Sequence, residues 1–87
     1  MSAASDAKMD PERDAQLRRL AEADAHIAAA ERAVTKQMAQ VEALSLAGQH
    51  TTVAERELTA FQETLAVLRD HRANIIKAME KIDAGLS

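Results

Sequence analysis

Apolar and polar residues follow a helical period along two long stretches of the chain, and the second stretch is the more regular. Between residues 58 and 86 the apolar positions are spaced by alternating steps of three and four, and Arg72 fills the one remaining slot. This heptad pattern is typical of a helix whose narrow apolar stripe packs against another helix. The apolar members of this seam are Leu58, Phe61, Leu65, Leu68, Ile75, Met79, Ile82 and Leu86.

The first stretch carries a wider, alanine-rich apolar face. Its central row, with members seven residues apart, consists of Leu20, Ile27, Val34 and Val41. The flanking residues are Leu17 and Met38 on one side and Ala23, Ala30 and Leu44 on the other. Asp24 and Glu31 occupy companion slots, so acidic residues interrupt the seam in the middle of the helix.

Helix boundaries are marked by local signals. Asp10 is a capping residue and Pro11 suits the first position of a helix. Gly48 is expected to end the first helix in the left-handed conformation. Thr52 and Glu55 have the spacing of a capping box at the start of the second helix. These signals predict helices over about 11–47 and 53–84, joined by a turn over 48–52.

The predicted fold class is all-α: an antiparallel two-helix hairpin with coiled-coil-like packing, because so short a connection makes neighbouring helices antiparallel. Residues 1–9 show no periodicity and are predicted to be a disordered tail, so the hairpin occupies 10–87. In the favoured register, which buries Leu17 and Met38, Val41 packs against Leu58. A competing register would place Leu44 on Leu58 instead.

Two helices alone form a thin interface, and alanine contributes little buried area to it. Val67 and Ile76 lie off the seam of the second helix. We therefore predict that two copies associate into a four-helix bundle with two-fold symmetry, so the expected partner is the chain itself. Another helical protein is a further expected partner.

Composition narrows the functional classes. The formal net charge is −3 and no basic cluster occurs, which argues against a nucleic-acid or anionic-membrane surface. No apolar run approaches the ~20 residues that a membrane-spanning helix needs. The chain has no cysteine, so it has neither disulfides nor thiolates. The N-terminal residues lack the pattern of a secretory signal, so a cytoplasmic location is expected.

His26 and His71 are the candidates for metal-binding chemistry, with Glu22 one turn before His26. Paired histidines beside a carboxylate can hold a divalent metal or respond to pH, although the same residues also suit a solvated rim. The Glu-x-x-His repeats of di-iron bundles are absent, since Ala23 and Leu68 stand three residues before the histidines. We find no catalytic arrangement and expect neither enzymatic activity nor a cofactor.

Arg72 is the charged residue within the second seam. In the favoured register it faces Ile27, between Asp24 and Glu31. The expected result is a charged layer in which the guanidinium bonds these acids and specifies register. The simpler alternative is an arginine that extends to solvent beside two exposed acids.

Several stretches of the chain resemble small bacterial helical-hairpin proteins without an assigned function. These stretches include Ala23–Ile27, Gly48–Thr52, Leu58–Leu65 and His71–Arg72. The resemblance covers about residues 17 to 79 and implies the same hairpin with no known activity. A second likeness is to small secreted hairpins of the WXG type, whose turn carries Trp-x-Gly where this chain has Ala47-Gly48-Gln49.

The function that these patterns favour is a non-enzymatic structural or protein-interaction module that self-associates. One alternative is a metal- or ligand-binding bundle that uses His26, His71 and nearby carboxylates. The other is a small secreted effector-like hairpin.

Overall fold

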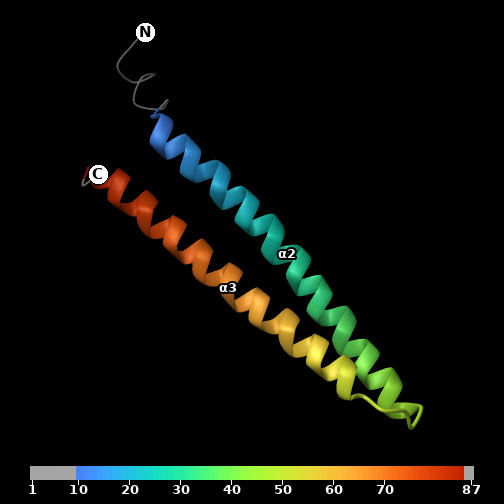
Figure 1. The fold of residues 1–87 in the computed structure, drawn as a ribbon. Helices are drawn as coiled ribbons and strands as arrows, with labels where there is room; N and C mark the ends of the chain where they lie inside the picture. Colours follow the sequence, from blue (N-terminus) through green and yellow to red (C-terminus); the bar gives the residue numbers. More distant parts are fainter. Residues whose placement is uncertain (1–9, 86–87) are drawn as a thin grey trace.

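The computed structural model describes residues 10–85, and it consists of two long α-helices joined by a short turn (Figure 1). Helix α2 spans Pro11–Leu46 and helix α3 spans Thr52–Asp83. The two helices pack side by side and antiparallel, so that the start of α2 and the end of α3 lie together (Figure 1). The molecule measures 68 × 22 × 12 Å. The all-helical hairpin is confirmed, whereas the predicted tail over 1–9 and Leu86 lie outside the described residues.

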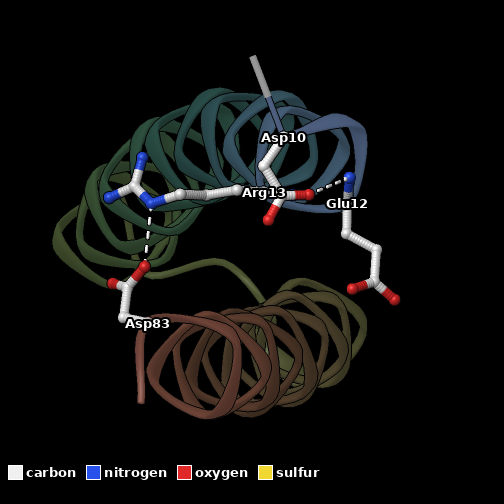
Figure 2. Close-up of polar contacts among 4 residues, drawn as sticks. All are labelled: Asp10, Glu12, Arg13 and Asp83. Carbon is white, nitrogen blue, oxygen red and sulfur yellow. Dashed lines mark hydrogen bonds and ion pairs between the residues drawn. The ribbon is translucent and has the colours of Figure 1, made fainter. Parts of the chain in front are cut away.

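Asp10 caps the start of α2. Its carboxylate Oδ1 accepts hydrogen bonds from the backbone amides of Glu12 (2.9 Å; Figure 2) and Arg13 (3.4 Å). These amides have no partner within the first turn of a helix, and Pro11 has no amide hydrogen that needs one. Local sequence therefore determines where α2 begins.

A Schellman motif ends α2. The amide of Gln49 donates to the carbonyl of Leu44 (2.9 Å), and the amide of Gly48 donates to that of Ser45 (3.0 Å). Gly48 has a φ of 72°, which confirms the left-handed conformation predicted for it. The chain is thereby turned back toward α3.

The start of α3 differs from the predicted capping box. The capping residue is Thr51, not Thr52, so Glu55 is the fourth helical residue rather than the third. The amide of Glu55 donates to the Thr51 carbonyl (2.8 Å) in the first helical hydrogen bond, and the Glu55 carboxylate accepts from the Thr51 hydroxyl (3.0 Å). This bond joins two side chains, and neither side chain caps the backbone.

The interface of α3 follows the predicted seam. Leu65 and Ile75 are buried, together with Ala54 nearer the turn. The remaining described seam residues are half-buried except Phe61, which is 38 % exposed. A single regular stripe leaves this helix only one way to pack.

Helix α2 packs with the flank opposite to the one that the predicted register favoured. Ala23 and Gln37 are buried, whereas Leu17 and Met38 are 40 % and 54 % exposed. The residues of α2 that are half-buried along the same seam are Leu20, Ile27, Ala30, Val34, Val41 and Leu44. The expectation that Leu17 and Met38 are buried is therefore wrong.

Charge explains this choice of flank. Leu17 and Met38 belong to a row with members seven apart that also contains Asp24 and Glu31, so burying the row would desolvate two carboxylates. The row that packs instead consists of Gln16, Ala23, Ala30, Gln37 and Leu44. It carries no charge, and its alanines let the helices approach closely.

The contacts match the predicted layering of the two helices only in part. Val41 and Leu58 line one hollow and Arg72 bonds Asp24, as the predicted register requires. The side chain of Gln37, however, bonds the carbonyl of Ala54, a residue that this register places opposite Ser45.

Candidate functional site

Arg72 and Asp24 form an ion pair across the hairpin. Arg72 is half-buried in the seam of α3, and its Nε donates to Oδ1 of Asp24 on α2. The two side chains remain 40 % and 52 % exposed. Arg72 thus packs its aliphatic stem in the interface while the charged ends of the pair reach solvent.

Glu31 was expected to bond Arg72 together with Asp24. Its carboxylate instead accepts a hydrogen bond from Nη2 of Arg69 (3.1 Å). The predicted single layer is therefore two separate ion pairs, one turn apart on α3 and two turns apart on α2. Arg69 was missed in the sequence because it lies outside the apolar seam. It belongs to the row of Ile76 and Asp83, which flanks the seam on the side of Asp24 and Glu31.

A third ion pair closes the end of the hairpin opposite the turn. Nε of Arg13 donates to Oδ1 of Asp83 at 2.9 Å, and Figure 2 shows the guanidinium of α2 reaching down to the end of α3. This hydrogen bond, helped by the charge of Asp83, raises the pKa of Arg13. Because the pKa of Arg13 is raised in the folded state, this contribution is present at neutral pH and is lost in strong alkali, where the guanidinium loses its proton.

Gln37 is a buried polar residue within the interface, and its burial was not expected from the sequence. Its Nε2 donates to the carbonyl of Ala54 (3.0 Å) and lies 3.4 Å from Oε2 of Glu57. Among the described residues no buried side-chain nitrogen or oxygen lacks a hydrogen-bond partner. The sequence signal that could have revealed Gln37 is its spacing of seven residues from both Ala30 and Leu44.

The candidate metal ligands lie on the surface of the two helices. His26, His71 and Glu22 are all exposed. Within residues 10–85 no group of three or more histidine, aspartate or glutamate side chains is arranged to hold a metal ion. Of the two residues expected to contact a second copy, Val67 is 66 % exposed and Ile76 is half-buried.

An apolar hollow lies beside the turn, and we call it the tip hollow. It has a volume of about 350 Å³, and its residues come from the end of α2 and the start of α3. Met38, Val41, Leu46 and Leu58 supply its apolar surface, with Glu42 and Ser45 beside them. Leu46 is 82 % exposed, so an isolated hairpin leaves a large apolar side chain in water here.

The fold and these contacts define an antiparallel helical hairpin with coiled-coil-like packing. Comparison of the chain with protein-family models, curated proteins and solved structures finds no match. In the described part of the chain neither helix has a segment long and apolar enough to cross a bilayer.

Proposed function

We propose that the chain is a non-enzymatic protein-interaction module that self-associates through its tip hollow to form a four-helix bundle. The observation that carries this proposal is the exposure of large apolar side chains beside the turn. Leu46 and Met38 both line the hollow, where a second copy of the hairpin would cover them.

Sedimentation equilibrium over a range of protein concentrations tests the proposal. We expect the wild-type chain to form a dimer at micromolar concentration and to melt at a temperature that rises with concentration. A folded monomer with a concentration-independent melting temperature would overturn self-association.

Leu46→Lys tests the tip hollow itself. A lysine in the last turn of α2 interacts favourably with the helix dipole, and no basic residue is present there, so the hairpin should stay folded. We expect this variant to be monomeric. Gln40→Lys is the matched control, because Gln40 is exposed on the same helix and does not line the hollow. If the Leu46→Lys variant dimerises to the same extent as the Gln40→Lys variant, the interface lies elsewhere. The Val67→Lys variant then tests whether the interface is on α3.

A further inference from the structure

A second hollow lies between the helices in the half of the molecule away from the turn, and we call it the polar groove. It has a volume of about 370 Å³. Gln16 and Arg19 come from α2, and the residues contributed by α3 are His71, Asn74, Ile75 and Ala78. Ile75 is buried in the seam, so it and Ala78 give the groove an apolar floor beneath a polar rim.

The rim of the polar groove consists of hydrogen-bond donors. Arg19 supplies a permanent cation, His71 an imidazole, and Gln16 and Asn74 an amide each, while no carboxylate lines the groove. Glu22, one turn along α2 from Arg19, is exposed and is not among the lining residues.

Arg19 differs from the arginines that join the two helices. Arg13, Arg69 and Arg72 each bond an acid of the opposite helix. Among residues 10–85 no hydrogen bond or ion pair of the structure involves the guanidinium of Arg19. Arg19 therefore lines the groove without a bonded acid.

We propose that the polar groove binds a small organic anion. A carboxylate or phosphate group would accept hydrogen bonds from Arg19 and His71, and a short apolar body would lie on Ile75 and Ala78. The groove lies on the flank opposite Asp24 and Glu31, whereas Met38 of the tip hollow belongs to their row. The groove and the tip hollow therefore lie on different flanks of α2.

The test is an NMR titration with hexyl phosphate that follows the imidazole signals of the three histidines. We expect the His71 signals to shift and saturate, while those of His50 at the turn stay unchanged as an internal control. Titration with hexanoate tests whether a carboxylate can replace the phosphate. Titration with inorganic phosphate tests whether the apolar body is needed for binding, and titration with hexanol tests whether the negative charge is needed. A hexyl phosphate titration that does not saturate, or a hexanol titration that matches it, overturns the proposal.

Arg19→Gln and Arg18→Gln form a matched pair of variants. Each removes one positive charge from the same turn of α2, but only Arg19 lines the groove. We expect Arg19→Gln to weaken hexyl phosphate binding about tenfold or more, since a hydrogen bond to a charged group is lost. Arg18→Gln should bind as the wild type does. Equal weakening by both variants would mean attraction to overall charge rather than a site, and would also overturn the proposal.

Discussion

Gln37 occupies a position in the interface where a leucine would bury more apolar surface. Its amide instead donates to the Ala54 carbonyl, which it reaches only when the helices keep the observed alignment. Buried polar residues in helical interfaces specify register at a cost in stability. We infer that Gln37 serves this role, which the sequence pattern had indicated for Arg72.

Replacing Gln37 with glutamate keeps the shape of the side chain but removes the donor. At neutral pH the introduced carboxylate would face the Ala54 carbonyl and the Glu57 carboxylate, and no donor would compensate its burial. We expect Gln37→Glu to lose ~2 kcal/mol or more of unfolding free energy at pH 7, measured by urea denaturation. The two acceptors raise the pKa of the new carboxyl in the folded state, so stability should recover as the pH falls and the group becomes a donor again.

Gln37→Leu is the control for this experiment. It removes the amide without introducing a charge, and we expect stability to be unchanged or to rise by up to ~1 kcal/mol. A Gln37→Glu variant as stable at pH 7 as the wild type would show that the amide donor makes no difference.

At the scale of the helices, the ends are determined locally and the packed faces are not. The Schellman motif at Gly48 depends on one left-handed residue, and a Cβ added there meets no atom within 4 Å. The cost of a side chain at Gly48 is therefore conformational rather than steric.

Gly48→Ala should reduce the unfolding free energy by ~1 kcal/mol, because alanine resists the left-handed conformation. Gly48→Val should cost at least as much, and Gly48→Asn less, since asparagine tolerates this conformation better. Thermal melts of the three variants at one protein concentration give the comparison. Equal stability of all three and the wild type would mean that the turn does not need a left-handed residue.

The ion pair of Arg72 and Asp24 should contribute little to stability, because both side chains are about half exposed. A double-mutant cycle with Arg72→Leu and Asp24→Ala measures the coupling between them. We expect a coupling energy below ~1 kcal/mol that decreases in 1 M salt. A coupling of several kcal/mol that salt leaves unchanged would contradict the exposed geometry.

The sequence predicted the two helices well and the packed flank of α2 poorly, for a physical reason. Asp10 and Gly48 act on the backbone next to them, so their effect can be read locally. Which flank of the central row of α2 is buried depends instead on how the two helices pack. Hydrophobicity alone favours the flank with Leu17 and Met38, but the acids in that row make the uncharged flank with Ala23 the better one to bury. The polar groove exists because packing of the two helices brings Arg19 and His71 to the same hollow, so the sequence alone could not reveal this groove.

At the scale of the whole molecule, the hairpin has a seam but little interior. Its buried residues are mostly small or medium in size, and no large side chain among those described is fully buried. Stability of the single hairpin is therefore expected to be modest. Covering the tip hollow would add burial at the turn, while the polar groove would remain open farther along the helices.

The order of the contacts along the hairpin has a consequence for how the chain folds. The Gln37 bond near the turn joins residues 17 apart, the Asp24 and Glu31 pairs join residues 48 and 38 apart, and the Arg13 pair at the far end joins residues 70 apart. The shortest loop has the lowest closure entropy to overcome, and each further layer then needs only a few additional residues to be ordered. The two helices should therefore pair from the turn outward. The Gln37 bond should be among the first contacts to form, and the Arg13–Asp83 pair should be the last to form and the first to open.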